Sequence, residues 1–293
     1  MISLSLTTVF IPVNGISRRV RLGRNNSVSE IEWVGIDAGT AWLGDNRGAL
    51  IHAGNGPLHE IRIQNEFEIS AEPITFAQWK ELTGQAVAGE NSEDPVNRLT
   101  PLMIESGLIG VQGNPRPPSE AEWALAAKQG AIGPGAVQVE VLSDRPPRSG
   151  YWGAPCDGRP WVPGVRAGGV SDHTAHTTRV WRGPGTMRGA TPRGVSRPQM
   201  GFRLVRSTKY EDGLHMPQAP SKSDLIFRES IIALLIGILP SFTWAYFNAS
   251  PNYLSESWLN IAVGGIFFSL MTAFLWRPKS SSFSVQDGKM RRD

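Results

Sequence analysis

Two long uncharged apolar segments near the C-terminal end constrain this chain more than any other feature of its sequence. Residues 230–247 and 257–276 contain no Asp, Glu, Lys or Arg. Each runs for roughly 18 to 20 positions, the length at which a helix crosses the apolar core of a bilayer. A pair of buried core helices is the alternative, but two such segments separated by a polar loop favour a membrane-spanning helical hairpin.

The basic residues around the spans predict the orientation of this hairpin. The loop at 248–257 has no Lys or Arg, whereas Lys222 and Arg228 precede the first span and Arg277 follows the second. Because loops rich in positive charge stay on the cytoplasmic side, we expect the soluble domain and both termini to be cytoplasmic. Aromatic side chains suited to the headgroup region flank the spans, namely Trp244, Tyr246, Trp258 and Trp276.

Small residues and a proline within the spans predict how the two helices pack. Gly237, Gly264 and Gly265 allow helix backbones to approach closely, and Pro240 can kink the first span. Neither span carries an ionisable side chain, so the hairpin alone does not offer a path for protons or ions.

The rest of the chain is predicted to form one soluble α+β domain. Glycine and proline are abundant, with 32 and 22 residues, which indicates many turns and little regular structure. The net charge of +3 is too small and too scattered to favour nucleic acid as a partner. The predicted organisation is an N-terminal extension at 1–30, the domain at 31–206, a linker at 207–224, the two spans within 225–277, and a polar basic tail at 278–293.

Two segments of the domain have the local signals of a helix. The first begins after Thr75, a suitable N-cap, and stops at Gly84. The second begins after Ser119, has Glu122 three positions later as the partner in a capping box, and ends at Gly130.

Several segments, taken in order, resemble a known family. They read EWVGIDAGTAWLGD, PLHEIRIQNEFEIS, EPITFAQWKELTG, PRPPSEAEWALAAKQG, VWRG and GFRLVR. This succession is similar to the formylglycine-generating-enzyme, or sulfatase-modifying-factor, family and covers most of residues 31–206. The resemblance implies an irregular C-type-lectin-like topology. It also implies a structural core that contains Trp79, Glu120, Glu122, Trp123, Trp181, Arg182, Phe202 and Arg203.

The chain departs from this family where the family carries its chemistry. The resemblance implies a pair of cysteines between the last two segments, where catalytic members bind copper, but residues 183–200 contain no cysteine. Cys156 is the single cysteine of the chain and lies upstream. One thiolate does not make a two-thiolate site. The family's tryptophan-containing segment before VWRG is also replaced, by GGVSDHTAHTTR. We therefore expect no formylglycine-generating activity and no cofactor.

Two groups of polar residues have alternative interpretations. Asp172, His173 and His176 are side chains that can bind metal, but no third firm ligand is visible beside the H-x-x-H pair, so a solvated loop without metal is favoured. The arginines near the resembling segments are expected to form internal ion pairs with Glu120 and Glu122. These arginines are Arg116, Arg182, Arg188, Arg193, Arg197 and Arg203. Alternatively, those between Arg182 and Arg197 face the bilayer or an acidic partner.

The leading functional hypothesis is a non-catalytic, membrane-anchored binding or scaffolding protein, such as an accessory subunit of an integral-membrane complex. Its expected partners are the lipid bilayer and another membrane protein. The first alternative is an oxidase of the resembled family that uses Cys156 and histidines in an unfamiliar arrangement. The second is a small-molecule or sugar-binding module, with Trp152 and Trp161 as candidate cleft residues.

Overall fold

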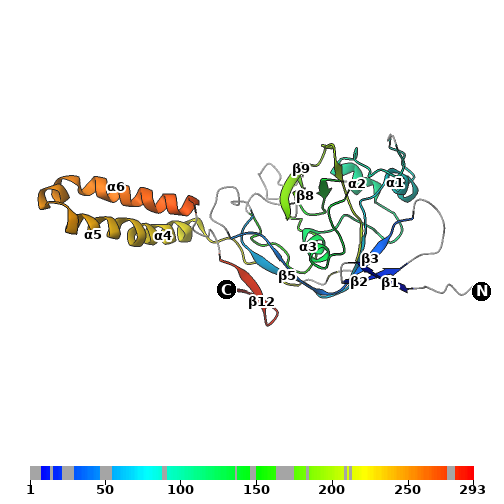
Figure 1. The fold of residues 1–293 in the computed structure, drawn as a ribbon, viewed down its shortest axis with the longest axis horizontal. Coiled ribbons are helices and arrows are strands. Elements are labelled where there is room, and N and C mark those ends of the chain that lie inside the picture. Colours follow the sequence, from blue (N-terminus) through cyan, green and yellow to red (C-terminus); the bar gives the residue numbers. More distant parts are fainter. Residues whose placement is uncertain are drawn as a thin grey trace, which may run out of the picture.

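The chain combines sheets and helices in a mixed α+β architecture, seen in the computed structural model, and a helical hairpin projects from one end of the domain (Figure 1). Strand β1 lies at the end away from this hairpin. The structure describes residues 8–13, 16–21, 30–46, 55–87, 91–135, 137–145, 150–162, 175–182, 185–207, 210, 213–275 and 281–293.

Three small sheets form the frame of the domain. The first has the order β1-β2-β3-β6-β11, with strands Thr8–Val13, Ile16–Arg21, Trp33–Ile36, Phe67–Ser70 and Val205–Ser207. The second has the order β10-β7-β8-β9, with strands Met200–Gly201, Val139–Val141, Ala175–Arg182 and Gly185–Pro192. The third has the order β13-β12-β5-β4, with strands Lys289–Arg292, Phe283–Gln286, His59–Ile63 and Gly39–Leu43.

Both helices expected in the domain are present with their expected caps. Helix α1 spans Phe76–Thr83, is capped by Thr75, and ends at Gly84 in the left-handed conformation. Helix α3 spans Glu120–Lys128, and Ser119 and Glu122 form the capping box. These short-range hydrogen bonds satisfy the free N–H groups of the first turn, which explains why local sequence was sufficient to locate both helices.

A third helix of the domain was missed in the sequence analysis. Helix α2 spans Pro101–Gly107, with Thr100 as its N-cap and Pro101 at its first position. Thr followed by Pro is itself a helix-start signal, because the missing N–H of proline costs nothing there. The segment is short and lacks a clear apolar period, so the helix depends on Ile104, which is 1% exposed in the core.

The core consists of two clusters of buried side chains. One packs Trp123 and Leu125 of α3 against β3, β4, β5 and β6. The other surrounds Trp79 of α1, which meets Phe202 edge-on at a ring-centroid distance of 5.7 Å. Trp79, Trp123 and Phe202 are therefore core residues, as the resemblance implied.

Two helical segments are long and apolar enough to cross a membrane. They span Lys222–Asn248, with 27 residues, and Pro251–Leu275, with 25 residues. Only 6% and 17% of their most apolar stretches are buried inside the protein, so they are not core helices of the domain. The first segment comprises α4 (Lys222–Ile232), a π-helical turn η3 (Ala233–Ile238) and α5 (Leu239–Asn248), and the second is α6.

The turn of the hairpin is shorter than expected. Helix α6 begins at Pro251 rather than at 257, because proline suits the first helical position and the Ser250 hydroxyl accepts a hydrogen bond of 3.3 Å from the Tyr253 N–H. The π-helical turn ends at Ile238, two residues before Pro240. A proline ring clashes with the carbonyl four residues earlier, and a wider turn relieves this contact.

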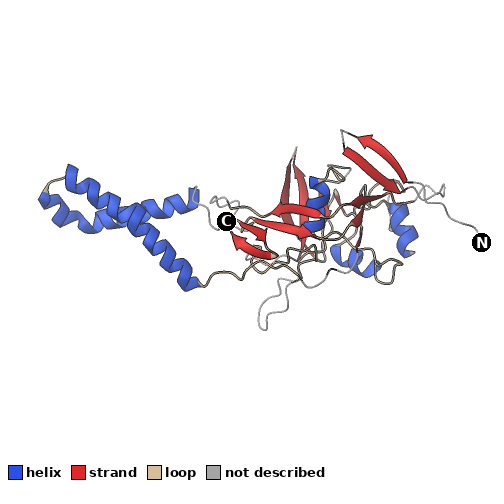
Figure 2. Cartoon of the chain, turned by 90° about the horizontal axis from the view of Figure 1, so that it is seen from below, coloured by secondary structure: helices blue, strands red, loops and turns tan. Residues whose placement is uncertain are grey.

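The two long helices cross (Figure 2), and the backbones of Gly237 and Gly265 meet where they are in contact. A Cβ atom on Gly237 would lie 2.0 Å from the carbonyl oxygen of Gly265, whereas one on Gly264 would meet nothing within 4 Å. The crossing therefore requires Gly237 and Gly265 but not Gly264, which the sequence analysis had grouped with them.

The C-terminal segment folds back onto the domain. The sequence analysis treats 278–293 as a polar tail, yet β12 and β13 form a hairpin, and β12 runs parallel to β5 through Phe283 and His59. The Phe283 ring packs edge-on against Trp152. The apolar helical hairpin is thus inserted between two parts of one domain, and both of its ends return to that domain.

The N-terminal extension also contributes to the domain. Strands β1 and β2 pair with each other, and β2 joins β3 through Val20 and Val34. They extend the first sheet beyond the predicted boundary near residue 31.

Candidate functional site

One cleft formed by described residues lies beside helix α2, and we call it the α2 cleft. It has a volume of about 720 Å³. Its walls come from α2, the segment 108–117, strand β7 and the segment around Pro160, and His176 of β8 also lines it. The exposed apolar side chains of its wall are Leu102, Ile109 and Val162, which are 44%, 81% and 49% exposed. Mostly apolar walls with a few polar groups are typical of ligand-binding sites.

A cluster of charged side chains meets at Glu105 in this cleft. The Glu105 carboxylate accepts hydrogen bonds from Arg145 Nη2 at 2.7 Å and from Arg193 Nη2 at 2.6 Å. Burial alone would raise the pKa of Glu105, but the hydrogen bonds from Arg145 and Arg193 outweigh burial and lower it. Glu105 is therefore held ionised between two guanidinium groups.

His176 is part of the same cluster and is 2% exposed. Its Nδ1 lies 3.0 Å from the Leu142 carbonyl oxygen, so this nitrogen is the N–H donor. Its Nε2 lies 3.2 Å from Glu105 Oε1, but the contact is not an aligned hydrogen bond. Burial lowers the pKa of His176. The ring is thus neutral near pH 7, with Nε2 as an acceptor.

Ser143 also lines the α2 cleft, and its buried hydroxyl has no hydrogen-bond partner among the described residues. Serine, histidine and glutamate occur together in nucleophilic sites, where the histidine must accept the serine proton. Here the two ring nitrogens of His176 face Leu142 and Glu105 instead. These contacts of His176 therefore do not activate the Ser143 hydroxyl as a nucleophile.

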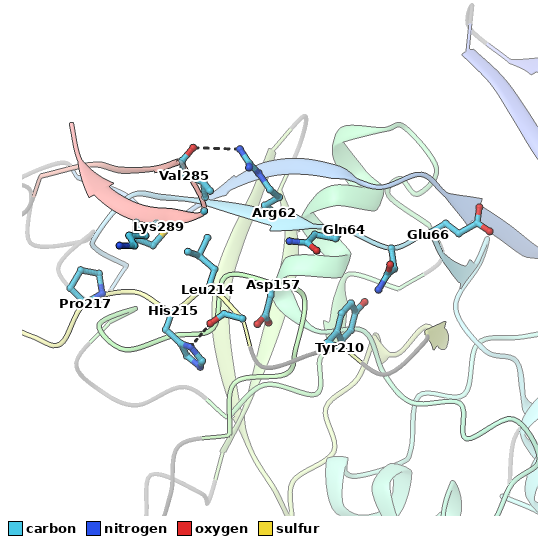
Figure 3. Close-up of a pocket in the computed structure, with 14 residues that line it drawn as sticks. Arg62, Gln64, Glu66, Asp157, Tyr210, Leu214, His215, Pro217, Val285 and Lys289 are labelled. Carbon is cyan, nitrogen blue, oxygen red and sulfur yellow. Dashed lines mark hydrogen bonds between the residues drawn. The ribbon is translucent and has the colours of Figure 1, made fainter.

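The second cleft is polar and lies between the domain and the segments that flank the helical hairpin (Figure 3). It has a volume of about 1030 Å³. Arg62 on its wall points to β12, and Arg62 Nη2 donates to the Val285 carbonyl at 3.4 Å. His215 and Lys289 lie on different segments of the wall. Most of these polar side chains are exposed, so this cleft is less constrained than the α2 cleft.

The predicted internal ion pairs are present around Glu120 and Glu122. Arg116 pairs with Glu122 at 2.8 Å, and Arg179 and Arg188 pair with Glu120 at 2.8 and 3.2 Å. Burial alone would raise the pKa of Glu120, but the charges of Arg188 and Arg179 hold it below its usual value. These pairs are structural, because α3 is fixed through them to β8 and β9.

The remaining arginines divide between different environments. Arg203 pairs with Glu140 at 3.0 Å, and Arg193 belongs to the α2 cleft. Arg197 is exposed, and the side chain of Arg182 lies outside the described residues. Trp181 is partly buried and donates from Nε1 to Glu140 at 2.8 Å. The sequence analysis named neither Glu140 nor Glu105 as an acidic partner.

Asp144 is a further buried carboxylate that the sequence analysis missed. It accepts hydrogen bonds from the Trp161 N–H at 2.8 Å and from the Glu120 N–H at 2.6 Å. Burial and the neighbouring Glu120 charge raise its pKa to about 7. Asp144 therefore links the start of α3 to the segment that carries Trp161.

The tryptophans considered for a ligand cleft are packing residues. Trp161 is 9% exposed and stacks on Tyr151, and Trp152 packs on Phe283. Neither lines the α2 cleft or the polar cleft.

Cys156 is a buried thiol. It is fully inaccessible, and its Sγ lies 3.6 Å from the Ala154 carbonyl oxygen. Burial and the nearby Asp157 raise its pKa to about 12. A thiol with this pKa is not a thiolate at neutral pH, and it is unsuited to bind a soft metal or to attack a substrate.

Of the metal candidates, Asp172 and His173 lie outside the described residues. His176 is placed in the α2 cleft, as described above. Within the described part of the chain, no group of three or more His, Cys, Asp or Glu side chains is arranged to hold a metal ion.

The aromatic residues assigned to the membrane interface lie near the hairpin turn. Trp244, Tyr246 and Trp258 are 66%, 71% and 56% exposed on the hairpin. Trp276 lies outside the described residues. Large exposed aromatic rings are unfavourable in water and suit the headgroup region of a bilayer.

The molecule is thus an α+β protein with two apolar helices of membrane-spanning length. No known family model and no curated protein matches the sequence. PvdO from Pseudomonas aeruginosa is similar in structure with 17% identity, a TM-score of 0.49, and coverage of 63% of this chain and 97% of that chain.

Two further solved structures have lower similarity. For Treponema denticola variable protein 1 the identity is 16% and the TM-score 0.38, with coverage of 67% of this chain and 100% of that chain. For CarF the identity is 14% and the TM-score 0.33, with coverage of 62% of this chain and 100% of that chain. These similarities are too low to assign a function, so the proposals below are based on the residues of this chain.

Proposed function

We propose that this protein is a membrane-anchored, non-catalytic binding protein that recruits or stabilises another membrane protein. In this proposal the domain is a divergent member of the formylglycine-generating-enzyme family with a C-type-lectin-like topology, and it works on the cytoplasmic side. The observation that carries the proposal is the α2 cleft, which combines exposed apolar walls with a charged cluster at Glu105.

The apolar walls support binding of a macromolecular partner. Leu102, Ile109 and Val162 are exposed on three separate segments around one concavity. Apolar patches of this kind cost free energy in water and are typical of interaction sites. The charged side chains at the base fix the orientation of a ligand more than they add affinity.

The state of Cys156 argues against the oxidase alternative. A redox-active copper site requires accessible thiolates, and this thiol is inaccessible with a pKa of about 12. The cysteine behaves as a small apolar core residue.

The attachment of the helical hairpin supports a partner in the same membrane. The Met216 N–H donates to the Ala154 carbonyl at 2.8 Å just before α4, and the Phe283 N–H donates to the Leu58 carbonyl at 3.0 Å after α6. The chain segments that join these hydrogen-bonded residues to α4 and α6 are short, so the domain stays close to the membrane surface. An accessory subunit of an integral-membrane complex would be placed in this way.

A pulldown from membranes in mild detergent, followed by mass spectrometry, tests the proposal. We compare the unaltered protein with Ile109→Glu, which places a charge on the cleft wall, and with Met187→Glu, which makes the same change at a side chain 49% exposed on β9. We expect an integral-membrane protein that is captured by the unaltered chain and by Met187→Glu, and is lost with Ile109→Glu. Equal capture by all three proteins would contradict a role for the α2 cleft.

A further inference from the structure

We propose that the α2 cleft receives the C-terminal end of a partner polypeptide, with the terminal carboxylate held by Arg193 and Ser143. This inference is based on the proposed binding function and names the chemical group that the site recognises. The charge balance, the unpaired polar atoms and the composition of the walls each support it.

The charge balance at the base of the cleft favours an anion. Two guanidinium groups, Arg145 and Arg193, share the single carboxylate of Glu105, at 2.7 and 2.6 Å. Two positive charges and one negative charge leave one positive charge. Arg193 bonds to Glu105 through Nε and Nη2, which leaves Nη1 for a ligand, and its side chain is 39% exposed. Guanidinium groups bind carboxylates through parallel hydrogen bonds.

Two polar atoms in the cleft have no hydrogen-bond partner within the part of the chain that the structure describes. They are Ser143 Oγ and His176 Nε2, and both are buried. A buried polar atom without a partner is rare in a folded protein and often marks a place where a missing ligand binds. A carboxylate accepts a hydrogen bond from the Ser143 hydroxyl, whereas Nε2 of the neutral His176 ring is itself an acceptor and donates none.

The walls of the cleft indicate what the carboxylate is attached to. Pro101, Pro115, Pro117 and Pro160 line the cleft. Proline has no N–H group, so these walls offer apolar surface and few backbone donors. Ser106 and Asn114 are polar side chains of the lining, but most of the wall is apolar, so we expect the ligand next to the carboxylate to be apolar.

The extent of the apolar surface favours a polypeptide over a small acid. The cleft volume of about 720 Å³ accepts a segment of a few residues. Ile109 on its wall is 81% exposed, so a ligand confined to the base would leave this side chain in water. A polypeptide that continues out of the cleft covers Ile109 as well.

Fluorescence anisotropy with the full-length protein in detergent micelles tests this inference. The probe is an equimolar pool of labelled heptapeptides that end in Leu, Ile, Val or Phe with a free carboxylate, and the matched control is the same pool with C-terminal amides. We expect the free acids to bind at least about tenfold more tightly, because the amide removes the charge-assisted bonds. Arg193→Gln and Ser143→Ala should reduce this preference, whereas Arg197→Gln, at an exposed arginine nearby, should preserve it.

The outcomes distinguish failure of carboxylate recognition from failure of the proposed binding function. If the free acids and the amides bind equally well, and Ile109→Glu weakens the binding of both, carboxylate recognition is overturned. The proposed binding function is then left intact. No binding of either pool would overturn this inference, while the pulldown with Ile109→Glu tests the proposed function separately. Octanoate that displaces the peptides at equal concentration would show that the site takes a small acid. A melting temperature for Arg193→Gln equal to that of the unaltered protein excludes a general loss of folding.

Discussion

Arg203 and Glu140 form an ion pair in which each side chain is only 1% exposed, with Arg203 Nε 3.0 Å from Glu140 Oε2. Glu140 also accepts hydrogen bonds from Trp123 Nε1 at 2.9 Å and from Trp181 Nε1 at 2.8 Å. Arg203 donates to the carbonyls of Ala71 and Gly133. The carboxylate of Glu140 on β7 thus connects helix α3 to strand β8 and to the segment that carries Arg203.

Removing one partner of this pair should destabilise the domain strongly. We expect Arg203→Met to lower the free energy of unfolding by about 3–5 kcal/mol, because it leaves a buried carboxylate without its cation. The double variant Arg203→Met, Glu140→Gln should lose much less free energy of unfolding than the two single variants together, since the amide oxygen still accepts hydrogen bonds from the tryptophans. Denaturant unfolding followed by tryptophan fluorescence measures this coupling. Additive effects would contradict it.

Asp144 should make stability depend on pH. Its folded pKa of about 7 lies above the ordinary value of 3.8, so ionisation is harder in the folded state than in the unfolded chain. The contribution of Asp144 to the free energy of unfolding is therefore fully present below about pH 4, and it is lost as the pH rises through about 7. The difference in melting temperature between Asp144→Asn and the unaltered protein should shift in favour of the variant from pH 5 to pH 8. A constant difference would show that Asp144 does not titrate in this range.

Cys156 should be unreactive in the folded protein. It is inaccessible and its pKa is about 12, so a maleimide should modify it only after addition of denaturant. Cys156→Ser should keep partner binding, and neither protein should convert a sulfatase-type cysteine peptide when supplied with copper. Turnover by the unaltered protein that disappears in Cys156→Ser would restore the oxidase alternative.

The crossing of the two long helices should depend on Gly237. In Gly237→Leu the new side chain meets the Gly265 backbone, whereas in Gly264→Leu it enters open space. Spin labels at the exposed positions Leu234 and Phe268 report the separation of the helices. We expect an increase on the order of a few ångströms for Gly237→Leu alone, because small residues permit close helix contact. The same distance in both variants would contradict the assigned crossing point.

The hairpin should be oriented with its turn outside the cell. The turn region lacks Lys and Arg, and positive charge is retained on the cytoplasmic side. An impermeant thiol reagent applied to intact cells should therefore label Ser255→Cys and not Gln286→Cys. The buried Cys156 gives little background. Labelling of residue 286 alone would reverse the orientation.

The sequence determined the features that depend on neighbouring residues. The caps at Thr75 and Ser119 and the glycine that ends α1 act over three or four positions, so they could be read from short segments. The two apolar helices follow from length and composition alone. The ion pairs of Glu120 and Glu122 were expected from the family resemblance, although the partner Arg179 was not.

Only the tertiary structure decided which distant segments meet. The Val285 N–H donates to Glu60 at 2.8 Å across 225 positions, and this contact turns a presumed tail into part of a sheet. Glu105, Arg145 and His176 come from separate elements, and none of them has a local signal that assigns it to a cleft. Local hydrogen bonds depend on the residues beside them in the chain. A pairing between distant segments depends instead on the shape and charge of the whole folded domain, and a single sequence does not specify these locally.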